Sequence, residues 1–241
     1  MRAILLLLLF PALGFTQQPP ANPTASVVSE NTLYVECQGE KPKQVLSPVW
    51  LSEDEKWRAY VQVDAQGEPE CLHTTRLWVA PADSSYRLAY FIPPYGDAVE
   101  NGMEILGFAN HSSLMLVRTE EWQWASDALP RQRVLAISAN TGKVYEPDLS
   151  SMLQSDEKEI CGLRVLDAGF SADENSNILI RAGFFSLQSL FGPAEEESPP
   201  AKRCGRKEET WSLNLVNGDV KQVASTQPLQ LFKKFLFRRD N

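Results

Sequence analysis

Two kinds of side chain in this sequence are suited to acid–base chemistry: clustered carboxylates and two histidines. The carboxylates stand at Glu53-Asp54-Glu55, Glu120-Glu121 and Asp173-Glu174, and the histidines are His73 and His111. A glycosidase needs two carboxyl groups that face each other across about 5–9.5 Å, and a histidine can serve as the general base of a hydrolase. The enzymatic hypothesis for this chain is therefore a hydrolase that acts on glycans or peptides through the turn carboxylates and His73.

The local sequence around these groups favours a non-enzymatic interpretation. Acidic residues in turns commonly face water and fix the turn geometry, and a histidine in such a position is more often a surface residue than a base. The string Gly169-Phe170-Ser171-Ala172-Asp173 lacks the second glycine of a serine-hydrolase elbow, and the sequence has no phosphate-binding glycine-rich loop. We expect a protein that is not an enzyme and carries no cofactor.

Residues 1–16 have the composition of a secretory signal peptide. Arg2 precedes the apolar residues 4–10, a run too short to span a bilayer, and small residues up to Thr16 offer a cleavage site. Residues 17–30 are rich in proline and small polar residues, which predicts a flexible linker. Because no later apolar run reaches membrane-spanning length, we expect a secreted or periplasmic protein without stable membrane insertion after signal removal.

The four cysteines of an exported chain are expected to form disulfides. They are Cys37, Cys71, Cys161 and Cys204. Three pairings are open, and we favour Cys37 with Cys71 and Cys161 with Cys204, because each bond would close a loop within or beside one repeat. No two cysteines have the C-x2-C spacing of a zinc site, so no metal is expected.

The charge of the chain argues against nucleic acid as a partner. The formal net charge is −8, and an acidic surface repels phosphate. Basic residues gather near the C-terminus, around Lys233, Lys234, Arg238 and Arg239. Leu229, Leu231, Phe235 and Phe237 recur there with a period of two, which favours a final edge strand over a segment that touches an anionic membrane.

One segment has the composition of a binding surface. Trp122 and Trp124 lie on the same side of an extended stretch, with Glu121 on the other side. Paired tryptophans beside polar groups form either a stacking platform for sugars or a contact point for a protein partner. The alternative is that both rings pack inside the fold.

The elements that must position these residues form three similar repeats, at about residues 45–97, 103–148 and 162–224. Each repeat reads as four short β-strands, with runs of apolar residues bounded by turn-forming residues such as Asn217-Gly218. Four strands per unit is the composition of a propeller blade. Two segments depart from the plan: a short helix is expected over 149–160, and a polar surface loop over 192–207.

The repeats resemble the blades of TolB-like and dipeptidyl-peptidase-type β-propellers. The resemblance rests on Trp50-Leu51-Ser52-Glu53-Asp54, on Phe170-Ser171-Ala172-Asp173, and on the hairpin around Asn140-Thr141-Gly142. It implies an all-β, propeller-like domain over residues 31–241 with about three four-stranded antiparallel blades. Strands near 32–37 and 229–237 would either pair to supply a partial fourth blade, or leave an open or collapsed β-array.

Such a scaffold implies no particular chemistry, because propellers serve binding, docking and catalysis alike. We therefore expect an exported, non-enzymatic module that binds a protein or glycan partner, with Trp122, Trp124 and Glu121 as the first candidate surface. Asn110-His111-Ser112 is in addition a formal N-glycosylation acceptor, which has meaning only in a eukaryotic host.

Overall fold

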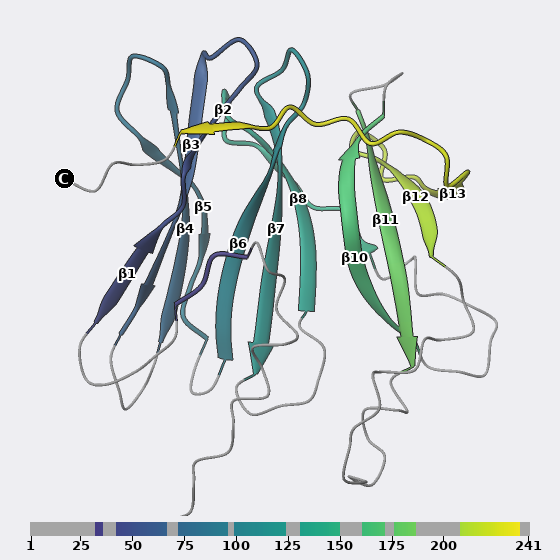
Figure 1. Ribbon diagram of the computed structural model, residues 1–241, viewed down its shortest axis with the longest axis horizontal. Helices are drawn as coiled ribbons and strands as arrows, with labels where there is room; N and C mark the ends of the chain where they lie inside the picture. Colours follow the sequence, from purple (N-terminus) through teal and green to yellow (C-terminus); the bar gives the residue numbers. More distant parts are fainter. Residues whose placement is uncertain are drawn as a thin grey trace, which may run out of the picture.

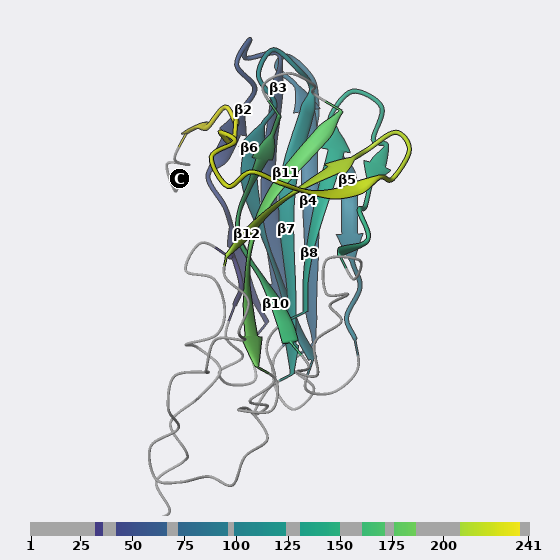
Figure 2. The same ribbon diagram turned by 90° about the vertical axis from the view of Figure 1, so that its right-hand side faces the viewer.

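The computed structural model describes residues 32–35, 42–66, 72–95, 99–123, 131–149, 161–171, 176–186 and 208–236, and most of them lie in antiparallel strands arranged as three sheets (Figure 1). The arrangement confirms the predicted all-β class with sheets of four antiparallel strands. In this part of the chain the sheets stand side by side as a row with two ends. Seen from the side of the last sheet, they lie one behind another (Figure 2).

Sheet 1 has the strand order β14 (Lys234–Leu236), β2 (Val49–Leu51), β3 (Trp57–Ala65), β4 (His73–Pro81) and β5 (Arg87–Ile92), with β1 (Lys43–Leu46) also paired to β3. Sheet 2 contains β6 (Val99–Phe108), β7 (Leu114–Gln123), β8 (Arg131–Ser138) and β9 (Val144–Tyr145). Sheet 3 contains β10 (Cys161–Phe170), β11 (Asn177–Ser186), β12 (Glu209–Asn214) and β13 (Val220–Val223).

The extra strands of sheet 1 still follow the four-strand plan. Strands β1 and β2 pair with successive parts of β3, so together they form one inner strand that is interrupted at Ser47 and Pro48. Proline has no N–H to give to a ladder, while the Ser47 hydroxyl accepts a hydrogen bond from the Val61 amide at 2.9 Å. The serine thus replaces the ladder bond that the break removes.

Two hydrophobic cores hold the row together, one on each side of sheet 2. In β3, Ala59, Val61 and Val63 are fully buried and alternate with half-buried side chains, so only one face of sheet 1 enters a core. In β7, Val117 enters the core with sheet 1 and Leu116 enters the core with sheet 3. Sheet 2 is apolar on both faces because it lies between the other two.

The C-terminal segment crosses the inner strand of every sheet, and residues 229–236 are called the strap below (yellow in Figure 1). Gln230 and Phe170 exchange two backbone hydrogen bonds, of 2.9 and 3.1 Å, at the end of β10. Phe232 and Phe108 do the same at the end of β6, at 2.7 and 2.9 Å. Strand β14 then pairs with β2. The strap therefore joins all three sheets through the backbone.

Two glycines make room for this close approach. A Cβ atom at Gly107 would lie 2.8 Å from the Phe232 carbonyl oxygen, and the residue has a φ of +147°. A Cβ atom at Gly169 would lie 2.8 Å from Leu229 Cβ and 2.9 Å from the Gln230 nitrogen. In sheet 1 the corresponding position is Trp50, whose ring instead packs on Phe235 with centroids 5.2 Å apart.

The terminal segments do not combine into a partial fourth blade, so that alternative is wrong for the described residues. Leu33 pairs with Met103 in the middle of β6, and the strap pairs with the three inner strands. Each segment covers an open inner edge, where unpaired N–H and C=O groups are available. The expected final strand near 229–237 is present, although only Lys234–Leu236 is regular.

Several sequence-based predictions fall outside the described residues. These are the signal peptide, the linker, most of the helix over 149–160, the loop over 192–207, Asp173-Glu174, Trp124, and the cysteines Cys37, Cys71 and Cys204. Cys161 begins β10. No bond between cysteines is established by the described part, so the two favoured pairings remain predictions.

The close approach of the strap backbone to Gly169 gives the first testable prediction. Gly169→Ala should lower the free energy of unfolding by about 1–3 kcal/mol, since the new methyl group overpacks against the strap backbone. Gly183→Ala is the matched control, because its Cβ would meet Leu166 only at an ordinary 3.4 Å. Urea denaturation measures both. Equal stabilities for the two variants would contradict the close approach of the strap.

Candidate functional site

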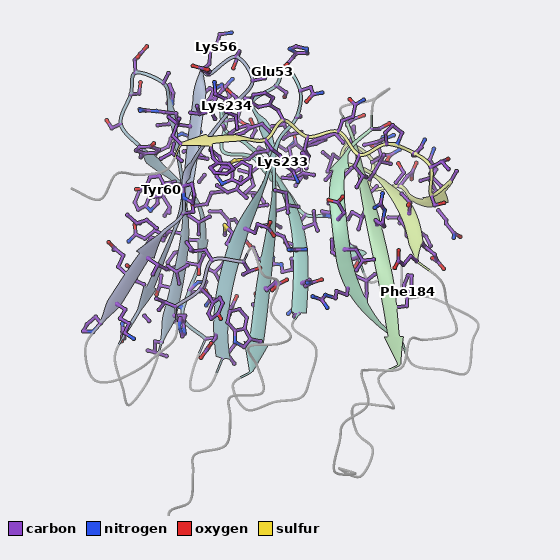
Figure 3. The ribbon with its side chains drawn as sticks, viewed as in Figure 1. Glu53, Lys56, Tyr60, Phe184, Lys233 and Lys234 are labelled. Atoms are coloured by element: carbon purple, nitrogen blue, oxygen red, sulfur yellow. The ribbon has the colours of Figure 1, made fainter. Side chains whose placement is uncertain are left out.

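The structure separates the groups that the hydrolase hypothesis would bring together. His73 is fully buried at the start of β4, opposite Ala65, and its Nε2 lies 2.5 Å from the Val35 carbonyl oxygen. Glu53 lies in the turn beyond the opposite end of this ladder (Figure 3). Eight steps of about 3.3 Å place the two ends roughly 26 Å apart. His73 and the turn carboxylates of sheet 1 cannot act on one bond.

Asp54 has a structural role in the same turn. Its Oδ1 accepts hydrogen bonds from the Ser52 hydroxyl at 2.8 Å and the Lys56 amide at 3.2 Å, and its Oδ2 pairs with Lys56 Nζ at 2.9 Å. The Lys56 side chain, followed by Ser52, lowers the pKa of Asp54 from 3.8 to about 2. The carboxylate stays ionised and fixes the turn between β2 and β3.

Glu120 belongs to a buried polar network between sheets 2 and 3. The carboxylate is fully buried and accepts a hydrogen bond from Gln132 Nε2 at 2.5 Å. Arg118 pairs with Glu104 at 2.5 Å, and its Nη1 donates to the Val165 carbonyl oxygen at 3.1 Å. Gln132 Oε1 accepts from the Val165 amide at 2.7 Å.

This network secures the irregular point of sheet 3. The register of β10 against β11 shifts between Val165 and Asp167, and side chains of sheet 2 bind both backbone groups of Val165. Burial raises the pKa of Glu104, while the charge of Arg118 opposes that rise. The buried carboxylates here hold Arg118 and Gln132, the two side chains that join sheet 2 to sheet 3, rather than facing a substrate.

The predicted binding residues are only partly available to a ligand. Trp122 is 5% exposed, its indole N–H donates to Glu100 at 2.9 Å, and its ring packs edge-on against Tyr34. This burial favours the packing alternative for Trp122. Glu121 lies 3.7 Å from Arg133, on the other face of β7.

A different surface presents aromatic side chains to solvent. Tyr60 lies on the side of sheet 1 that faces away from the other two sheets (Figure 3). We call this side the outer face of sheet 1; its large apolar and aromatic members are Leu46, Tyr60, Trp78, Leu88 and Phe91. Leu46, Leu88 and Phe91 are 38%, 46% and 43% exposed. They lie on β1 and β5, on either side of Tyr60 and Trp78.

The rings of the outer face are held in place by one another and by arginines. Tyr60 stacks on Trp78 with centroids 6.5 Å apart, and it meets the edge of Tyr86 at 4.8 Å. Arg58 lies 5.2 Å above the Tyr86 ring, and Arg76 lies 5.6 Å above the Phe91 ring. Such contacts fix the ring orientations before any partner arrives.

Polar groups on the same face are paired internally. Arg76 forms an ion pair with Asp64, and Gln62 Nε2 donates to Asp64 at 2.8 Å. Gln62 Oε1 in turn accepts from the Trp78 indole at 3.0 Å. The face therefore combines preorganised aromatic rings with one ion pair, between Arg76 and Asp64, whose charges neutralise each other.

The sequence contains a signal for this surface, which lies in the alternation of residue types along two strands and not in paired tryptophans. In β3 and β4, apolar residues alternate with polar or aromatic ones, whereas β7 and β11 contain consecutive apolar residues. The alternation marks sheet 1 as having only one buried face. In these strands, an aromatic residue at a position that alternates with the buried ones, such as Tyr60 or Trp78, is then expected to lie on the exposed face.

Comparison with known proteins does not identify a ligand for this surface, because no family model and no curated protein matches the chain. Within the described ranges, no helix has both the length and the apolar character needed to cross a membrane. The same ranges contain no cluster of three or more histidine, cysteine or carboxylate side chains placed to bind a metal ion.

The buried network predicts a large effect of Arg118→Met. Removing the guanidinium leaves Glu104 and Glu120 without their cation, and loss of one partner of a buried pair costs about 3–5 kcal/mol of unfolding free energy. Lys56→Met removes the cation of an exposed pair and should cost less than about 1 kcal/mol. Chemical denaturation compares the two. Similar losses would contradict a stabilising network between sheets 2 and 3.

The turn of sheet 1 predicts a pH dependence. Because the folded-state pKa of Asp54 is depressed, its contribution to stability is present above about pH 3.8 and is lost as the pH falls toward 2. NMR titration of the carboxyl carbon should show a midpoint near pH 2. Lys56→Met should raise that midpoint, since Lys56 is the largest cause of the shift. An unchanged midpoint would exclude this pairing.

Proposed function

We propose that this protein is a non-enzymatic binding module that captures a protein partner on the outer face of sheet 1. The observation that carries the proposal is the set of exposed apolar residues around Tyr60 and Trp78. Tryptophan, tyrosine and arginine are the residue types most enriched at the centre of protein interfaces. Rings that are already ordered lose little conformational entropy on binding.

The chemistry of the face favours a protein over a sugar. Sugar platforms need an open aromatic face, but Tyr60 and Trp78 are stacked on each other, and Arg76 lies over Phe91. The charges of Arg76 and Asp64 are paired, so the face has no unbalanced charge from this pair to attract an ionic ligand. We therefore expect the partner to present a complementary surface that is largely uncharged and carries apolar and aromatic side chains.

A variant pair tests this proposal. Tyr60→Ala/Trp78→Ala should leave the chain folded, because both residues lie outside the two cores, and should weaken partner binding by about 2 kcal/mol or more. Val216→Ser is the control, since Val216 is 83% exposed in the turn between β12 and β13. Proteins captured by the wild type would be purified and their affinities measured by calorimetry.

Three outcomes would contradict the proposal. The purified partner could bind the double variant as tightly as the wild type, which would place the interface elsewhere. A glycan array could give the only saturable binding, lost in the same variant, which would make the ligand a sugar. Turnover of a glycan or peptide substrate by the pure protein would revive the hydrolase alternative.

A further inference from the structure

The strap is recognised by the sheets chiefly through its backbone. At Phe170, at Phe108 and along β2, the inner strand of each sheet meets the strap in antiparallel register. An extended segment that adds to a sheet edge is a general mode of peptide recognition. Three consecutive sheet edges here receive one segment.

The receiving edges are shaped for such a segment. Gly107 and Gly169 leave room for a backbone where any side chain would come within 3 Å of it. Consecutive strap residues then enter different cores: Leu231 packs with sheets 2 and 3, and Phe232 packs with sheets 1 and 2. Further along, Lys234 pairs with Glu55, and Phe235 packs on Trp50. The edges therefore select both an extended backbone and a side-chain pattern.

The strap is connected to sheet 3 by a short exposed hinge. Residues 224–226 are exposed, and the Gln227 amide donates to the Ala224 carbonyl at 3.1 Å in a turn. Strand β13 lies at the far edge of sheet 3 from β10, so the chain must cross about four interstrand spacings of 4.8 Å, or roughly 19 Å, to reach its place beside β10. The same segment can reach the same edges of another molecule.

We propose that the inner edges of the three sheets are a binding site for an extended peptide with the strap's side-chain pattern, and that a second copy of this chain supplies that peptide in a strand-exchanged dimer. The dimer contains the same contacts as the monomer. Its population is set by protein concentration and by how easily the hinge lets a strap return to its own sheets.

Deletion of residues 225–227 tests the proposal in the full chain. From Val223 to Gln230 the chain has seven steps, which extend to about 23–25 Å, and the deletion leaves four steps, or about 13–14 Å. The shortened hinge can no longer reach its own edge, so light scattering should show a dimer. Insertion of Gly-Ser-Gly at the same place is the matched control and should give a monomer. A monomeric deletion variant would overturn the proposal.

A second substitution shows whether the dimer uses the strap site. Gly169→Ala in the deletion background should raise the dissociation constant of the dimer by about tenfold or more, because the methyl group obstructs the incoming segment. Gly183→Ala should leave it unchanged. A dimer that does not respond to Gly169→Ala would be held by another surface and would overturn the proposal.

Refolding of the wild type keeps the proposal testable if the deletion variant does not fold. Unfolded wild-type chains diluted from urea at rising protein concentration should give a rising fraction of dimer, since exchange is then a bimolecular event. Insertion of Gly-Ser-Gly into the hinge at residues 225–227 should reduce that fraction several-fold at each concentration, because a longer hinge lets each strap return to its own sheets, whereas Val216→Ser should not. A fraction of dimer that is zero at every concentration would overturn the proposal.

Discussion

The structure depends on how the open inner edges of three separate sheets are satisfied. In a closed propeller, ring closure supports the blades from both sides. Here the sheets stand in a row, and a single C-terminal segment bonds to the inner strand of each one. Its backbone bonds at Phe108 and Phe170 satisfy polar groups that would otherwise need other partners. The strap thus holds the three sheets together as one unit, although their strands come from separate parts of the sequence.

The row also determines which surfaces are available for function. Sheet 2 has apolar residues on both faces because it separates two cores, and the buried Arg118 network adds a polar connection to sheet 3. Sheet 1 closes one end of the row, and its outer face carries paired polar groups and ordered rings together with the exposed Leu46, Leu88 and Phe91. The same face is the one on which we place partner binding.

Much of this architecture could be predicted from local sequence patterns. The alternation of Ala59, Val61 and Val63 with polar or aromatic residues predicts a strand with one buried face. In sheet 3, Asn217-Gly218 predicts the hairpin between β12 and β13. The repeats near 45–97, 103–148 and 162–224 contain the strands of sheets 1, 2 and 3, apart from β1, which begins at Lys43, β6, which begins at Val99, β10, which begins at Cys161, and the strap. These features depend on neighbours in the chain, which a single sequence displays.

The rest depends on contacts between distant segments. Gly107 and Gly169 look like repeat motifs, and only the strap's backbone shows why side chains are absent there. The burial of Trp122 follows from Glu100 and Tyr34, which its own segment does not reveal. A sequence shows where a strand forms, but not which edge or face another segment will cover.

Native-state hydrogen exchange of the strap tests the central claim most directly. If the strap completes the fold, the amides of Gln230 and Phe232 should exchange only in global unfolding, with the same protection as the amides of Phe108 and Phe170 that they pair with. Exchange of Gln230 and Phe232 at the fast rate of a fraying terminus, while the strands of the two cores stay protected, would contradict it.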